Sequence, residues 1–124
     1  MEWNVVKIEE TSGKNVPFVS IGRGMMDFNA VACKLVDDNG QYKYAQLLTA
    51  KEKGKAVVAV KFLEEPETNT IPIKRKIQNG KTVQGMTIVN KGVIAQLFGK
   101  DGSNEGMVRH KVERIESNML KIIE

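Results

Sequence analysis

The chain has 124 residues, with 19 lysine and arginine side chains against 15 aspartates and glutamates, so its formal net charge is +4. This length suits a single domain, residues 1–124, with a core of its own, and a content of 27% charged and 41% hydrophobic residues argues against a disordered chain. Cys33 is the one cysteine, which excludes an internal disulfide and a four-cysteine zinc site and favours a reducing, cytoplasmic compartment.

Signals for export or membrane insertion are missing from the sequence. The N-terminal residues lack the basic start, the apolar run and the cleavage site of a secretory signal. The longest uninterrupted apolar run, Ala56–Val60, is far shorter than the ~20 residues that a membrane helix needs. We therefore expect a cytoplasmic protein without a membrane partner.

The first predicted elements are a strand, a turn and a short helix. The strand covers Val16–Ile21, and the glycines on either side of Arg23 allow the chain to turn after it. Asp27 or Asn29 can cap the helix, because either side chain can accept hydrogen bonds from the free amides of the first turn. Apolar residues at the spacing of one helical face then continue to the helix end at Leu35.

A β-hairpin is predicted next. Its strands are Tyr42–Leu48 and Ala56–Leu63, and the polar segment Thr49–Lys55 between them contains Gly54, which suits a turn. The acidic, proline-containing segment Glu64–Asn69 follows, and we expect it to be an exposed loop or linker.

Asn79–Gly80 gives the strongest local signal of the sequence. Asn-Gly is the preferred centre of a two-residue hairpin turn in which both residues have positive φ, and it lies here between the β-rich runs Thr70–Gln78 and Lys81–Val89. The register that follows pairs Gln78 with Lys81, Ile77 with Thr82, Ile73 with Met86 and Ile71 with Ile88. One face of this hairpin is then apolar, and the other is basic near the tip. Arg75 shares the apolar face and is expected at the rim of the core.

The last third predicts a second helix and a second hairpin. Asn90 can cap a helix with an apolar stripe of Val93, Ile94, Leu97 and Phe98, and Gly99 can end it. A glycine-rich loop, Gly99–Gly106, leads into the strands Met107–Ile115 and Met119–Ile123, which turn at Ser117–Asn118.

These elements predict an α+β fold that is mostly β. Residues 1–67 and 68–124 show the same order of strand, helix, strand and strand, which favours two β-α-β-β repeats at low sequence identity. Two such units can form one compact, barrel-like domain with two short helices, because closure buries the strand edges of each unit.

The run Ile21–Asn29, the helix that ends at Leu35 and the following hairpin resemble the AbrB-type, transition-state-regulator-like swapped-hairpin unit. In that family two chains each supply one unit to a shared barrel that binds DNA through basic residues. The resemblance implies a pseudo-dimer within one polypeptide and a DNA-binding role for Arg23, which matches the family's Gly-Arg pair. This sequence has Asn29 in place of the family's proline, and Gln84–Met86 where the second half would need its Gly-Arg pair.

Charge is concentrated in the second half of the chain. Residues 1–67 hold nine basic and ten acidic side chains, whereas residues 68–124 hold ten basic and five acidic ones, so the balances are −1 and +5. Such an asymmetry is a candidate electrostatic footprint for a polyanion, although exposed strands also carry lysines merely to prevent aggregation. The candidate phosphate contacts are Arg23, Lys74, Lys76, Lys81, Arg109, Lys111 and Arg114.

Catalytic chemistry finds little support. Cys33 and His110 are the only members of their types, and no spacing suggests a metal site, a nucleotide-binding loop or another cofactor. Asp37–Asp38 and Glu64–Glu65 are interpreted as solvated loop residues rather than as catalytic carboxylate pairs. We therefore predict a protein that is not an enzyme and has no cofactor.

Three functional classes remain open. The first is a DNA-binding transcriptional regulator that contacts phosphates through a basic hairpin and strand. The second is a single-stranded nucleic-acid-binding protein, in which Tyr42 and Tyr44 stack on bases, although both tyrosines could equally face the core. The third is a non-enzymatic protein-interaction domain, and homodimerisation is also left open.

Overall fold

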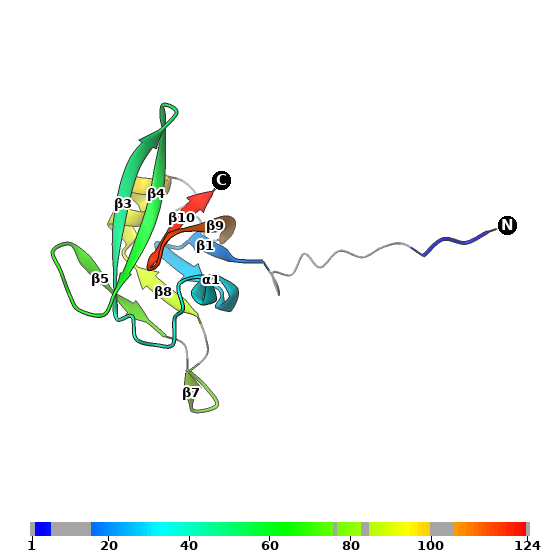
Figure 1. The fold of residues 1–124 in the computed structure, drawn as a ribbon, viewed down its shortest axis with the longest axis horizontal. Helices are drawn as coiled ribbons and strands as arrows, with labels where there is room; N and C mark the ends of the chain where they lie inside the picture. Colours follow the sequence, from blue (N-terminus) through cyan, green and yellow to red (C-terminus); the bar gives the residue numbers. More distant parts are fainter. Residues whose placement is uncertain (1, 6–15, 76, 83–84, 100–105, 124) are drawn as a thin grey trace.

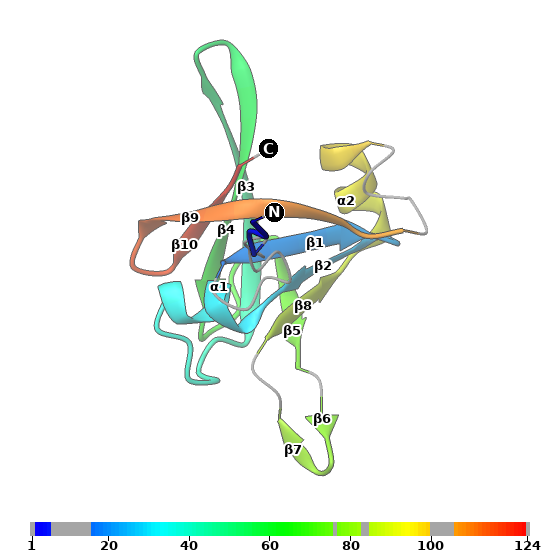
Figure 2. The same ribbon diagram turned by 90° about the vertical axis from the view of Figure 1, so that its right-hand side faces the viewer.

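Eight antiparallel strands close into a barrel, and two short helices and two hairpin extensions are attached to it (Figures 1 and 2). The computed structural model describes residues 2–5, 16–75, 77–82, 85–99 and 106–123. In their order around the barrel the strands are β1 (Phe18–Gly22), β2 (Met25–Phe28), β8 (Met86–Val89), β5 (Thr70–Lys74), β3 (Tyr44–Glu52), β4 (Lys55–Leu63), β10 (Met119–Ile123) and β9 (Val108–Glu116). Pairing of β9 with β1, from Phe18 opposite Lys111 to Ile21 opposite Val108, closes the ring.

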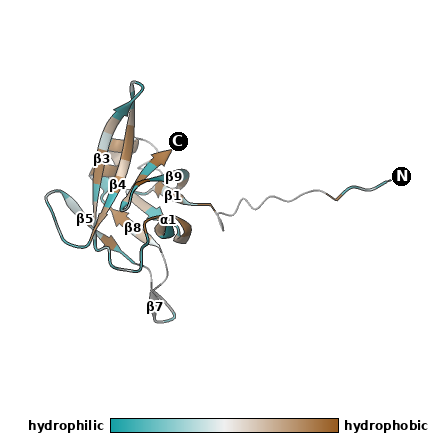
Figure 3. Cartoon of the chain, viewed as in Figure 1, coloured by the Kyte–Doolittle hydropathy of each residue, from teal (hydrophilic) through white to brown (hydrophobic). Residues whose placement is uncertain are grey.

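The core fills the barrel because alternate residues of each strand point inward. Phe28 of β2 and Phe62 of β4 meet edge to face at its centre, with ring centroids 5.3 Å apart. In Figure 3 apolar colouring follows the barrel strands, whereas the loop between β4 and β5 is hydrophilic. That loop contains the exposed segment 64–69, in agreement with the prediction. The coarse fold class, mostly β with two short helices, is therefore confirmed.

Both helices begin and end close to where the sequence predicts. Asn29 caps α1 (Ala30–Leu35) by accepting a hydrogen bond from the Ala32 amide, whereas Asp27, the alternative cap, lies within β2. Asn90 caps α2 (Lys91–Phe98) in the same way through the Val93 amide, and Gly99 follows its last turn. Within the described ranges, no helix is both long and apolar enough to cross a membrane.

The β3–β4 hairpin is longer than predicted and projects beyond the barrel. Its two strands pair over their full length and join through Lys53 and Gly54, whose φ values of 51° and 80° are those of a two-residue hairpin turn. Polar residues such as Thr49 and Lys51 continue the strand because they are surrounded by solvent, so their polarity does not end it. We call this projection, residues 49–58, the arm.

The Asn79–Gly80 hairpin has the predicted register only at its tip. Residues 77–78 (β6) and 81–82 (β7) pair as predicted and form a small separate sheet, which we call the ribbon. At the base the prediction is wrong: Ile73 lies opposite Ile88 instead of Met86, and Ile71 pairs with β3. In the barrel, β5 and β8 pair two residues out of step with the register of β6 and β7. An even offset preserves which face points inward, so Ile73 still packs against the core.

Candidate functional site

The outer surface of β1 and β9 brings together two of the predicted phosphate contacts. Arg109 lies opposite Ser20 and Lys111 opposite Phe18, on the face away from buried Val112. The Arg109 guanidinium carbon lies 4.4 Å from the centroid of the Phe18 ring, within cation–π distance. Among the described residues, no carboxylate forms an ion pair with Arg109 or Lys111. We call Phe18, Ser20, Arg109 and Lys111 the β1–β9 face.

Arg23 and Arg114 are both exposed but have different relations to this face. Arg23 occupies the turn directly after β1 with a φ of 54°, at the end of the strand pair that holds Arg109. Arg114 lies opposite Leu120 and shares the alternation of Val112, so its side chain leaves β9 on the other side from Lys111. All three cations of this strand lie on β9, as predicted, but Arg114 does not share a face with Arg109 and Lys111.

The basic hairpin predicted from the sequence lies on another side of the barrel. Lys74 is exposed on β5, which is four strands from β9 in either direction around the eight-stranded ring. The ribbon extends from the end of the barrel next to β5 (Figure 2). Lys81 belongs to β7 in this ribbon, and Lys76 lies outside the described residues. The structure thus separates Lys74 from Arg109 and does not join them in one basic face.

The two tyrosines do not share a stacking surface. Tyr42 packs against the core at a ring distance of 5.9 Å from Phe62, and its hydroxyl donates a hydrogen bond to the Val36 carbonyl. Burial raises the pKa of Tyr42 above its ordinary value. Tyr44 lies on the outer side of β3, opposite Pro72 and Leu63. Tyr42 is therefore a core residue, which is the alternative that the sequence left open.

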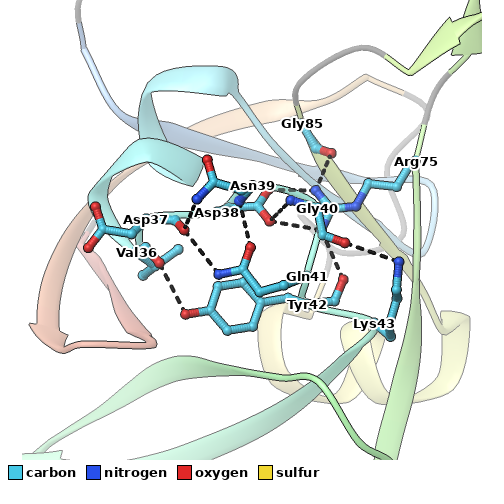
Figure 4. Close-up of polar contacts among 10 residues, drawn as sticks. All are labelled: Val36, Asp37, Asp38, Asn39, Gly40, Gln41, Tyr42, Lys43, Arg75 and Gly85. Atoms are coloured by element: carbon cyan, nitrogen blue, oxygen red, sulfur yellow. Dashed lines mark hydrogen bonds and ion pairs between the residues drawn. The ribbon is translucent and has the colours of Figure 1, made fainter.

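Asp38 is buried, contrary to the solvated position expected for it. Only 5% of its surface is exposed, and Arg75 donates hydrogen bonds of 2.5 and 3.0 Å to its two carboxylate oxygens (Figure 4). Arg75 also donates to the carbonyls of Tyr42 and Gly85, and the Gly40 amide donates to Asp38. Arg75 thus lies at the rim of the core, as its register predicts, and links the base of the ribbon to the loop after α1.

The surroundings of Cys33 favour a protonated, unreactive thiol. It is 1% exposed, and burial, followed by the nearby Asp38 charge, raises its pKa to about 12. A nucleophilic cysteine needs a lowered pKa, so these surroundings do not activate it. Groups of three or more histidine, cysteine or acidic side chains with metal-binding geometry do not occur in the described part of the chain.

A groove of about 690 Å³ lies between the arm, the end of β10 and α2. Apolar side chains of all three elements line the groove, and lysines from the arm and β10 are also part of its lining. His110, which the sequence predicts as a solvated or phosphate-facing strand residue, lines the groove and lies 6.2 Å from the Phe98 ring, centroid to centroid. Sequence reasoning missed the groove because it forms between residues near positions 55, 97 and 122. Comparison with protein-family models, curated proteins and solved structures finds no match.

Proposed function

We propose that this protein binds nucleic acid and that the β1–β9 face makes the principal phosphate contacts. The observation that carries the proposal is the pairing of Arg109 and Lys111 with Ser20 and Phe18, which gives two exposed cations beside a hydroxyl and an aromatic ring. Such a set supplies charge for phosphates and a planar group for a base or sugar. Arg23, at the end of the same strand pair, is a third candidate contact.

The proposed mechanism is phosphate neutralisation without a catalytic step or a cofactor. Each lysine or arginine that contacts a phosphate releases condensed counterions, so the affinity should fall steeply as salt rises. Cys33, as the one cysteine of the sequence, fits the reducing cytoplasm in which we propose that the protein acts.

One structural feature favours binding of single-stranded nucleic acid, and another favours binding of a duplex. Phe18 on the β1–β9 face favours single strands, because aromatic side chains stack on unpaired bases. The ribbon favours a duplex, because a projecting two-stranded hairpin can enter the major groove while lysines of this segment contact the backbone. Lys74, Lys76 and Lys81 would make these contacts.

We further infer that the barrel consists of two related halves. Exchange of β1, β2, β3 and β4 for β5, β8, β9 and β10 leaves the strand order around the barrel unchanged. β2 and β8 pair symmetrically about Asp27 opposite Thr87, and β4 and β10 pair with Val60 opposite Leu120. Two barrel strands precede each helix, with the ribbon strands β6 and β7 inserted between those of the second half, so the proposed repeat is β-β-α-β-β, one strand longer than the unit expected from the sequence. The strand order supports a pseudo-dimer, and descent from an AbrB-type DNA-binding unit stays part of the proposal.

The proposal is tested by fluorescence anisotropy with a labelled duplex and a labelled single strand, each at two salt concentrations. We expect binding at low salt that weakens as salt rises. Replacement of Arg109 and Lys111 together by alanine should weaken binding on the order of tenfold or more and lower the salt slope by about two. The matched control is Lys34→Ala with Lys51→Ala, which removes two exposed charges from α1 and the arm.

Further variants decide which nucleic acid is bound. Phe18→Ala should selectively weaken single-strand binding, whereas alanine at Lys74, Lys76 and Lys81 should selectively weaken duplex binding. Absence of binding to either oligonucleotide at low salt would overturn the proposal, as would equal losses from the double variant and its control.

A further inference from the structure

The edge of β4 that faces the groove lacks a neighbouring strand within the described part of the chain. β10 pairs with β4 only at Lys61, Val60 and Ala59, whereas β3 pairs with β4 over its full length. Ala59 and Lys121 form a non-hydrogen-bonded pair, so the last ladder bond joins the Ile122 amide to the Val58 carbonyl. Among the described residues, Lys55, Ala56 and Val57 therefore have a strand partner on one side only, and all three line the groove.

Backbone alternation indicates which groups this edge presents. The Phe62 amide donates to the Asn118 carbonyl, toward β10, and the Leu63 carbonyl accepts from the Lys43 amide, toward β3. Because successive residues of a strand direct their amide and carbonyl groups to opposite sides, Val58 and Ala56 have the same orientation as Phe62. The Val58 carbonyl is used in the ladder with β10, so the N–H and C=O groups of Ala56 are the ones directed toward the groove with which an added strand could pair.

The opposite wall offers contacts for side chains of such a strand. Leu97 and Phe98 of α2 and Ile122 and Ile123 of β10 line the groove. An occupant with apolar side chains would suit this wall.

The charge around the groove is positive. Lys53, Lys55 and Lys121 line it with Glu52 as the one acidic residue among its described lining. Lys121 forms a 2.5 Å ion pair with Glu52, and the hydrogen bond in this pair raises the pKa of Lys121. Lys121 and Glu52 cancel in charge, which leaves the two arm lysines to attract an anionic occupant.

We propose that the groove binds an extended, acidic segment of a partner protein, which adds as a strand to the open edge of β4 at Ala56, beyond its pairing with β10. Apolar side chains of this segment would lie against Phe98 and Ile122, and acidic ones would face Lys53 and Lys55. Strand addition of this kind gains affinity from backbone hydrogen bonds and specificity from the pockets for alternate side chains. This protein–protein activity goes beyond nucleic-acid binding and uses other residues.

The arm lysines have a simpler explanation, since charged residues often protect open strand edges from aggregation. That explanation accounts for Lys53 and Lys55. It does not account for an apolar wall of α2 and β10 facing the same edge.

The test is an anisotropy titration of the full chain with a fluorescein-labelled peptide in which valine and glutamate alternate around a central phenylalanine. Two control peptides accompany it: one is N-methylated at every backbone nitrogen, and the other has lysine in place of glutamate. We expect the first peptide to bind, the methylated peptide to bind at least about tenfold more weakly, and the lysine peptide to bind several-fold more weakly.

Ala56→Pro tests the edge from the protein side. It removes an N–H that faces the groove and leaves the ladder with β3 intact, so affinity should fall about fivefold, the loss typical of one hydrogen bond. Ala56→Ser retains the N–H and serves as the matched control. Circular dichroism establishes that both variants fold, and if Ala56→Pro does not fold, the pair of unmethylated and methylated peptides decides the question.

Three outcomes would overturn the proposal. The first is equal binding of the methylated and unmethylated peptides, and the second is unchanged affinity in a folded Ala56→Pro variant. The third is a groove that takes up decanoate, which has no peptide bonds, as seen by methyl NMR shifts of Val58 and Ile122, but binds neither acidic peptide.

Discussion

Arg75 donates hydrogen bonds of 2.5 and 3.0 Å to the two carboxylate oxygens of Asp38, which lies 37 positions earlier in the chain. The Arg75 side chain is 17% exposed and that of Asp38 is 2% exposed, so both charges are largely removed from water. Loss of one partner leaves the other charge without its counterion in a position that water scarcely reaches.

We therefore expect Arg75→Met and Asp38→Asn each to lower the free energy of unfolding by about 3 kcal/mol, the usual cost of breaking a buried pair. The double variant should lose clearly less free energy of unfolding than the sum of the two single losses, because it leaves neither charge buried without its counterion. Urea denaturation of the four proteins measures this coupling. Strictly additive losses would show that the pair does not act as a unit.

Asn29 does more than cap α1. Its side-chain oxygen accepts hydrogen bonds from the Ala32 amide at 2.9 Å and the Phe18 amide at 3.1 Å, and its nitrogen donates to the Val16 carbonyl at 2.8 Å. The Asn90 side chain, by contrast, accepts the capping hydrogen bond from the Val93 amide at 3.2 Å. Asn29 therefore joins a helix end to the start of β1.

Asn29→Ala should accordingly destabilise the protein by about 2 kcal/mol, and Asn90→Ala by about 1 kcal/mol. Thermal and urea unfolding compare the two variants directly. Asn29→Asp retains the accepting oxygen and should cost less than Asn29→Ala, so a larger loss for aspartate would contradict the assigned role of that oxygen.

Gly24 and Gly54 occupy equivalent turns with different surroundings. Both have positive φ, 70° and 80°. A Cβ at Gly24 would lie 2.8 Å from the Lys91 Cα, whereas one at Gly54 would meet no atom within 4 Å. Gly54→Ala should cost about 1 kcal/mol for its backbone conformation, and Gly24→Ala about 2 kcal/mol more for displacing the start of α2. Equal losses in urea unfolding would rule out the close approach of the β1–β2 turn to α2.

The buried thiol predicts a loss of stability at alkaline pH. Because the pKa of Cys33 rises from 9.0 to about 12 on folding, the folded state holds its proton more tightly than the unfolded state. The associated stability is complete below about pH 9 and declines as the pH rises from there toward about 12. Urea unfolding at about pH 8 and about pH 10 should show this decline in the wild type and a smaller one in Cys33→Ala.

Iodoacetamide provides an independent measurement on the same thiol. The folded protein should react far more slowly than the protein in urea, because Cys33 is buried and protonated. Rapid alkylation of the folded chain at neutral pH would contradict both properties.

Local features of the fold could be predicted from the sequence. Asn29 and Asn90 act as caps, Gly99 ends α2, and Asn79–Gly80 turns the ribbon, because each depends on residues only a few positions away. The register at the ribbon tip follows from the same turn. The register at its base does not, since β8 is fixed by β2 and β5 together.

The composition of the candidate sites could be predicted from the sequence less well than these local features, because it depends on the tertiary fold. Alternation along one strand separates Arg114 from Lys111, and barrel closure separates Lys74 from Arg109 by four strands. The partner of Asp38 is 37 positions away, which explains why a local pattern reads this residue as solvated.

The sequence by itself determined that the chain is a basic, mostly β domain with two capped helices, because charge, capping and turn formation are properties of single residues and near neighbours. Only the tertiary structure decided which cations share the β1–β9 face, that Asp38 is buried, and that β4 has an open edge beside α2. These features require residues from distant parts of the chain to meet, and that meeting is set by closure of the barrel around a common core.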